Sequence, residues 1–162
     1  MRSGDTIAGQ QAVRRRRPRR MLWWIGGGLG GLALLAAGVL YHLNYVPADL
    51  DLSAIRLSAQ GVYRISYVSR RDPIPVSQIH AWTIHVATAD GRPVEHAAVS
   101  IDGTMPRHIH GLPTRPQVTK ELGNGDYLVE GLKFHMPGWW VVDFQIDAAG
   151  QRDVVRFNLV LR

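Results

Sequence analysis

Two segments decide the fold, Trp140-Val-Val-Asp-Phe-Gln-Ile146 and Val154-Val-Arg-Phe-Asn-Leu-Val-Leu161. In both, large apolar residues fall on every second position, which is the side-chain period of a β-strand. Ala148-Ala-Gly150 lies between them and predicts a turn. We therefore expect two long strands that each bury one face. The residues expected to point inward are Trp140, Val142, Phe144, Ile146, Val155, Phe157, Leu159 and Leu161.

The same alternation occurs repeatedly upstream, with turn residues between the runs. No amphipathic helix is expected beyond residue 43, and the region 104–116 is rich in proline and glycine and predicts a loop. About seven short strands without helices favour an immunoglobulin-like antiparallel β-sandwich. The further predicted strands are Val62–Val68, Ile79–Ala87, Val94–Ile101, Gln117–Glu121 and Tyr127–Phe134, with a short one at Leu52–Leu57.

The N-terminal part predicts a membrane anchor. Met21–Leu40 contains no charged residue, and a helix of about 20 residues spans the hydrocarbon core of a bilayer. Trp23, Trp24, Tyr41 and Tyr45 flank it as interfacial aromatic residues do. We expect a tail at 1–20, a transmembrane helix at 21–43, a connector at 44–61 and the sandwich at 62–162.

Arginines set the expected orientation of this anchor. Because positive charge is retained on the cytoplasmic side, the N-terminus is expected in the cytoplasm and the sandwich in the periplasm, on a single-pass protein of a bacterial inner membrane. A cleaved signal peptide is the alternative, but its apolar core would be shorter and would end in a small-residue cleavage site. The orienting residues are Arg14, Arg15, Arg16, Arg17, Arg19 and Arg20.

The charge distribution argues against nucleic acid as a partner. The formal net charge is +6, but residues 1–20 alone hold seven arginines against one aspartate. From Asp49 onward, twelve basic residues balance twelve acidic ones. We therefore expect no basic face in the folded part that could bind the phosphates of a nucleic acid.

Two segments combine methionine, proline and histidine: Met105-Pro-Arg-His-Ile-His-Gly111 and Phe134-His-Met-Pro-Gly-Trp-Trp140. Thioether and imidazole donors together suit Cu(I), whereas Mg²⁺ or Ca²⁺ would require oxygen ligands. The chain contains no cysteine, so thiolate ligands are excluded.

Alternating strand directions would gather these side chains at one end of the sandwich. The predicted copper ligands are Met105, His108, His110 and Met136. His135 and His80 are the second choice, and in place of the methionines they would favour Zn²⁺ or Cu(II). A simpler interpretation is that His-x-His is solvated loop and that Met136 packs in the core.

An ordered series of motifs resembles the YtkA-like domain family over residues 79–161. The motifs are Met105-Pro-x-His-x-His-Gly, Pro113-x-x-Pro-x-Val118, Gly123-x-Gly-x-Tyr127, Gly131-x-x-Phe134 and Met136-Pro-Gly-Trp139. The resemblance implies a small extracytoplasmic β-sandwich, similar to the FixH and CopC-like proteins linked to copper handling and respiratory oxidase maturation. It also implies that Met105, His108 and His110 bind metal, with Met136 next.

No motif of nucleophilic, phosphate-binding or paired-carboxylate catalysis occurs, so we do not expect an enzyme. The expected function is that of a membrane-anchored periplasmic copper-binding protein, a metallochaperone or accessory factor for a membrane or respiratory metalloenzyme. The alternative is a metal-free accessory or scaffold subunit that docks on a larger membrane complex.

Overall fold

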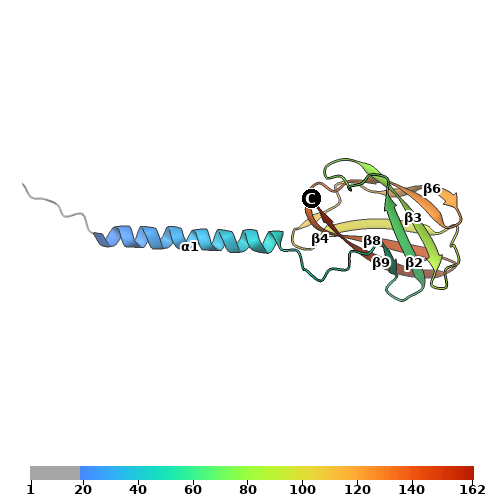
Figure 1. Cartoon of the computed structure of the whole chain (residues 1–162), viewed down its shortest axis with the longest axis horizontal. Helices are drawn as coiled ribbons and strands as arrows, with labels where there is room; N and C mark the ends of the chain where they lie inside the picture. Colours follow the sequence, from blue (N-terminus) through green and yellow to red (C-terminus); the bar gives the residue numbers. More distant parts are fainter. Residues whose placement is uncertain (1–18) are drawn as a thin grey trace, which may run out of the picture. The chain divides into compact units, whose positions relative to one another are not determined.

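The computed structural model describes the backbone of residues 19–162 and the side chains of residues 31–162. Over this range the chain forms one helix, α1 (Arg19–Asn44), and nine β-strands (Figure 1). The chain divides between Leu40 and Tyr41 into two compact units. The second unit contains all the strands.

The predicted anchor coincides with α1 along most of its backbone. Among residues 31–162, no helix is both long enough and apolar enough to cross a bilayer. The first half of the predicted anchor, 21–30, lies outside the described side chains, and so do Arg19 and Arg20. The remaining orienting arginines, Arg14–Arg17, lie outside the described residues altogether. The anchor and its orientation therefore stay predictions.

The strands of the second unit are all antiparallel in the sheet. They are β1 (Ile55–Leu57), β2 (Tyr63–Ser69), β3 (His80–Thr88), β4 (Ala98–Met105), β5 (His110–Gly111), β6 (Gln117–Gly123), β7 (Asp126–Leu132), β8 (Gly138–Ala148) and β9 (Gln151–Leu161).

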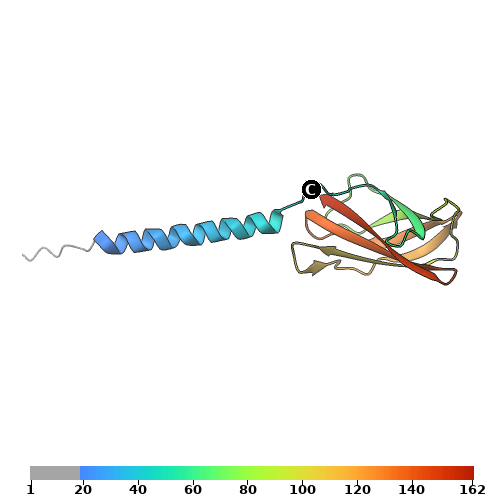
Figure 2. The same cartoon turned by 90° about the horizontal axis from the view of Figure 1, so that it is seen from below.

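One sheet contains every strand, in the order β1-β2-β3-β7-β6-β4-β8-β9, with β5 paired to β4. β6 and β4 share a single residue pair, Ser100 with Gln117, so the sheet folds over at this seam into two facing layers (Figures 1 and 2). The amide of Ala59 donates to the carbonyl of Val154 at 2.8 Å, which brings the outer strands together on the other side. The predicted fold class, an all-β antiparallel sandwich, is confirmed.

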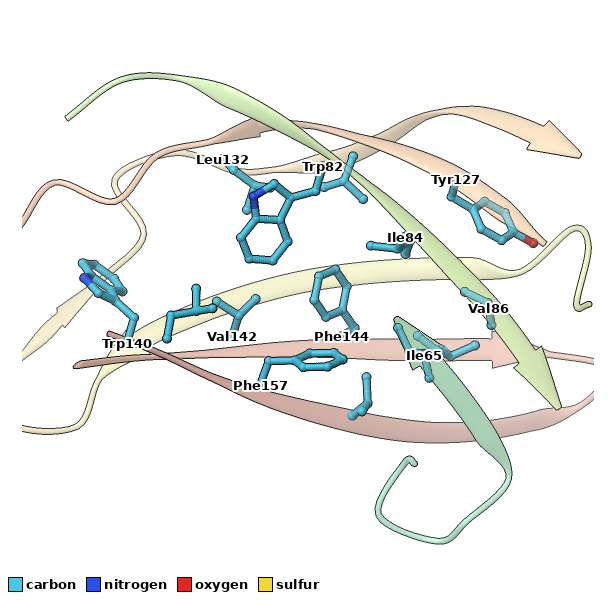
Figure 3. Close-up of a cluster of buried hydrophobic side chains, with 14 of the residues drawn as sticks. Ile65, Trp82, Ile84, Val86, Tyr127, Leu132, Trp140, Val142, Phe144 and Phe157 are labelled. Atoms are coloured by element: carbon cyan, nitrogen blue, oxygen red, sulfur yellow. The ribbon is translucent and has the colours of Figure 1, made fainter. Parts of the chain in front are cut away.

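The core lies between the two layers. Trp82, Ile84 and Val86 project from β3 toward Phe144 of β8 and Phe157 of β9 (Figure 3). All five are fully buried, as the period of two predicts for one face of each strand. Burial of these large side chains is the main source of stability for the fold.

The predicted boundaries of the fourth strand were wrong at both ends. β4 begins at Ala98 and not at Val94, because the Tyr127 hydroxyl donates to the Val94 carbonyl at 2.6 Å and accepts from the Ala97 amide at 3.1 Å. These bonds occupy polar groups that a strand ladder would use. At the other end β4 continues to Met105 along the eleven-residue β8.

Gly103 lies inside β4, two residues beyond the predicted end of that strand at Ile101. Its role is close packing. A Cβ added there would lie 3.0 Å from Cγ of Leu112, so the absence of a side chain lets the loop after β5 approach the strand.

Hydrogen bonds to Asp153 connect the β1–β2 turn to β9. Its buried carboxylate accepts hydrogen bonds from the amides of Gln60 at 3.0 Å, Val62 at 3.3 Å and Val154 at 2.8 Å. Burial by itself raises the pKa of Asp153, but the hydrogen bonds from Ser58 and from the backbone outweigh burial and hold this pKa below its usual value.

We expect Asp153→Ala to lower the free energy of unfolding by about 2–3 kcal/mol, because the amides would lose a charged acceptor. Urea denaturation at neutral pH measures this loss, with the exposed Asp90→Ala as the control. Since the pKa is lowered by folding, the contribution is present above the unfolded value of about 3.9 and is lost as the pH falls through the folded value. Equal losses in both variants would contradict this role.

Candidate metal centre

Three parts of the fold meet at one end of the sandwich, which we call the histidine end. They are the end of β4 with the following loop, the β7–β8 connection and the start of β3. Met105 is paired with His110 across β4 and β5, and His80 is paired with Leu132 across β3 and β7. The strand directions thus place these segments together, as their alternation predicts.

Three imidazole rings form a row at the histidine end. The ring centroids of His108 and His110 lie 5.9 Å apart, and those of His110 and His135 lie 5.2 Å apart. The ring of His135 also lies 5.4 Å from that of Trp140, which is fully buried. The row therefore runs from the exposed tip of the β4–β5 hairpin to the edge of the core.

The two methionines lie close to the core, and Met105 is paired with one histidine of the row. Met105 is only 2% exposed, and its methyl carbon would be 3.2 Å from a Cβ at Gly138. Residues opposite one another in an antiparallel pair project from the same face, so Met105 and His110 share a face. Met136 is half-buried against the core, and its carbonyl accepts a hydrogen bond from the Trp140 indole at 2.9 Å.

His80 does not join the histidine row. Its ring is buried beside Phe134, 5.6 Å between centroids, and Phe134 in turn lies 5.2 Å from Trp140. His80 Nδ1 donates to the Gln78 carbonyl at 3.1 Å, because a carbonyl can only accept. Its Nε2 is buried without a hydrogen-bond partner among the described residues.

The environment of His80 favours the neutral imidazole. Burial lowers the pKa of His80, the bond to Gln78 acts in the opposite direction, and the charge of Arg71 lowers the pKa further. A neutral ring that donates from Nδ1 presents a free lone pair on Nε2.

We expect the stability of the domain to fall as the pH drops below about 6.5, because the unfolded chain then binds a proton that folded His80 does not. His80→Phe should remove this part of the pH dependence while retaining a ring in the core. Urea denaturation of both proteins between neutral and mildly acidic pH measures the difference. Parallel pH profiles would contradict the assignment.

The other described histidines of the sandwich have carboxylate partners away from the row. His85 lies 2.7 Å from Asp126 and His96 lies 3.1 Å from Glu121. Across residues 31–162, no set of three or more histidine, cysteine, aspartate or glutamate side chains is placed to hold one metal ion. Two of the four ligands predicted from the sequence are methionines, so the predicted site is not a set of this kind.

One residue at this end was not singled out in the sequence. Arg107 stands over the ring of Tyr45, with 5.2 Å from its guanidinium carbon to the ring centroid. Arg107, Tyr45 and Trp139 line a small pocket beside Met105 and His108. Sequence spacing carries no signal for this contact, because Tyr45 precedes the first strand and Arg107 follows the fourth.

A family model described as YtkA-like matches residues 58–145. Among solved structures, a DUF4426 family protein from Pseudomonas aeruginosa PAO1 is similar at 15% identity with a TM-score of 0.49, over 67% of this chain and 96% of that one. No curated protein matches the sequence.

Proposed function

Because the chain belongs to the YtkA-like family, we propose that it is a membrane-anchored, periplasmic copper-binding protein. It would hold Cu(I) at the histidine end and deliver it to, or keep it available for, a membrane metalloenzyme. In this proposal residues 21–43 span the bacterial inner membrane, the arginine-rich tail is cytoplasmic, and the sandwich is of the immunoglobulin-like type.

The observation that supports this function best is the histidine row with Met105 paired to one of its histidines. Imidazole and thioether are the donors that Cu(I) prefers when thiolate is absent, and the chain has no cysteine. A metal ion lies about 2.0 Å from an imidazole nitrogen, so rings 5.9 Å apart at their centroids can share one ion after a modest rotation.

The proposed ligands are Met105, His108, His110 and Met136. His135 is a fifth candidate, because its ring is next to that of His110 and its Nδ1 is buried without a hydrogen-bond partner among the described residues. The donors are graded in exposure, from exposed His110 to buried Met105. Exposed outer ligands suit exchange of the ion with another protein.

The direct test is metal competition on residues 46–162. We expect this fragment to bind about one Cu(I) against a Cu(I)-selective chelator and to prefer Cu(I) to Zn²⁺, because thioether is a soft donor. A preference for Zn²⁺ would assign the ligands to histidines alone. Failure to bind either ion would contradict the proposal.

The second candidate is a metal-free accessory subunit of a membrane complex. Ile109, between the two histidines, is fully exposed at the hairpin tip, where a partner subunit would cover its apolar side chain. Co-purification of the full chain with a larger complex, together with an elemental analysis that finds no metal, would favour this alternative.

A further inference from the structure

The histidine end is basic, although the folded part of the chain is neutral in sum. The segments that connect elements at this end are 45–54, 70–79, 106–116 and 133–137. Together with Arg162 they contain six basic residues and three acidic ones, Asp49, Asp51 and Asp72, for a net charge of +3. We call the six residues the basic collar. They are Arg70, Arg71, Arg107, Arg115, Lys133 and Arg162.

This arrangement corrects the expectation that the folded part has no basic face. The sum over the sequence is zero because most of the carboxylates lie elsewhere. Many are at the opposite end, where Glu121, Asp126 and Asp147 pair with His96, His85 and Arg152. The net charge of the sequence cannot show that basic and acidic residues lie at opposite ends. The directions of the strands decide at which end each residue lies.

The collar residues have no carboxylate partner in the part of the chain that the structure describes. The arginines that form ion pairs there are Arg56, Arg92, Arg152 and Arg156, and none of these belongs to the collar. Unneutralised positive charge on one end produces a local field that attracts an anionic surface.

Apolar side chains project from the same end. Ile109 is 104% exposed at the tip of the β4–β5 hairpin, and Ile79 is 65% exposed just before β3. The pair of Arg107 and Tyr45 adds a cation and an aromatic ring. Exposed apolar residues together with arginines and an aromatic ring are typical of surfaces that bind lipid headgroups.

The residues where the predicted anchor ends lie at this end of the sandwich. Leu43–Val46 line the same pocket as Met105 and Arg107. If residues 21–43 cross the bilayer, the chain leaves the membrane at residues that line a pocket of the histidine end.

We propose that the basic collar and Ile109 dock the histidine end onto the anionic headgroups of the bilayer. The proposal rests on the membrane anchor in the function proposed above, but not on copper. Each arginine near an anionic bilayer contributes about 1 kcal/mol, or about fivefold in the ratio of docked to free domain. An ion released from the histidine row would then leave at the membrane surface, which favours a membrane-embedded acceptor.

A label at Ile109 tests the docking in the full chain. Because the chain has no cysteine, Ile109→Cys can carry one environment-sensitive fluorophore. The matched control is Ala89→Cys in the β3–β4 turn, which is exposed and lies at the opposite end. Both proteins are placed in nanodiscs of phosphatidylcholine with or without phosphatidylglycerol.

We expect the Ile109 label to shift to the blue and to be quenched by lipid-borne quenchers only with phosphatidylglycerol present. The Ala89 label should remain in water in both bilayers. High salt should reverse the shift, since the Debye length falls from about 10 Å at 0.1 M to about 3 Å at 1 M. Arg70→Gln, Arg71→Gln and Arg115→Gln should each lower the docked-to-free ratio about fivefold.

An Ile109 label that stays in water in both bilayers would overturn the docking. The basic collar would then be expected to bind an acidic protein surface. Failure of the chain to enter nanodiscs would overturn it as well. Copper competition on residues 46–162 is independent of both outcomes, so failure of the docking and failure of the copper proposal can be told apart.

Discussion

Replacing both His108 and His110 by alanine should weaken Cu(I) binding by at least about 100-fold, because even loss of a residue that only supports a ligand costs 10- to 100-fold. The two rings supply the outer half of the proposed site and lie 5.9 Å apart. Their loss leaves Met105 and Met136 without an exposed partner. Competition with a Cu(I) chelator measures the change.

The fold should tolerate this double substitution. His110 is exposed and His108 is half-buried, and surface changes of this kind usually alter stability little. The matched control is His85→Ala with His96→Ala, which removes two imidazoles from elsewhere on the sandwich. Cu(I) affinity that is the same in both double variants would remove the site from this loop.

The largest loss of stability is expected from Trp82→Ala, at about 3–5 kcal/mol. Trp82 is fully buried, stacks on Tyr67 at 4.4 Å between centroids and lies 6.0 Å from Phe134 and 6.2 Å from Phe144. Alanine would leave a cavity between the two layers that rigid strands cannot close. The measurement is urea denaturation of residues 46–162.

Val68→Ala is the control for this substitution. Val68 is on the neighbouring strand, opposite Thr83, and is 68% exposed on the outer face. Its replacement should change the free energy of unfolding by less than about 0.5 kcal/mol. A loss below about 1 kcal/mol for Trp82→Ala would mean that the two layers are not packed as the structure places them.

The strands with strict alternation were predictable because burial of one face imposes a period of two. β8 and β9 follow the alternation around Trp140 and Phe157 closely. The predicted fourth strand was displaced by four residues, because the start of β4 depends on hydrogen bonds with Tyr127, some thirty positions away. Local patterns cannot carry such a contact.

The candidate site was predictable in part for the same reason. Strand alternation was enough to bring His108, His110 and His135 to one end. It could not show that Met105 is buried, because its burial depends on the extension of β4 along β8 and on the space left by Gly138. It also could not show that His80 is buried beside Phe134 and does not join the row.

The distribution of charge over the surface was the feature least predictable from the sequence. Twelve basic and twelve acidic residues cancel in a sum. Within the part of the chain that the structure describes, the arginines at the histidine end form no ion pair, and many of the carboxylates form ion pairs elsewhere. A domain without net charge can therefore present a basic surface.

The central claim is that imidazole and thioether groups at the histidine end hold one copper ion together. X-ray absorption at the copper edge of Cu(I)-loaded 46–162 tests this most directly, because nitrogen and sulfur neighbours scatter differently. The account predicts both histidine nitrogen and methionine sulfur bound to the same ion, with the sulfur signal reduced by Met105→Leu. A spectrum with only nitrogen and oxygen neighbours, or a domain that retains no copper, would contradict it.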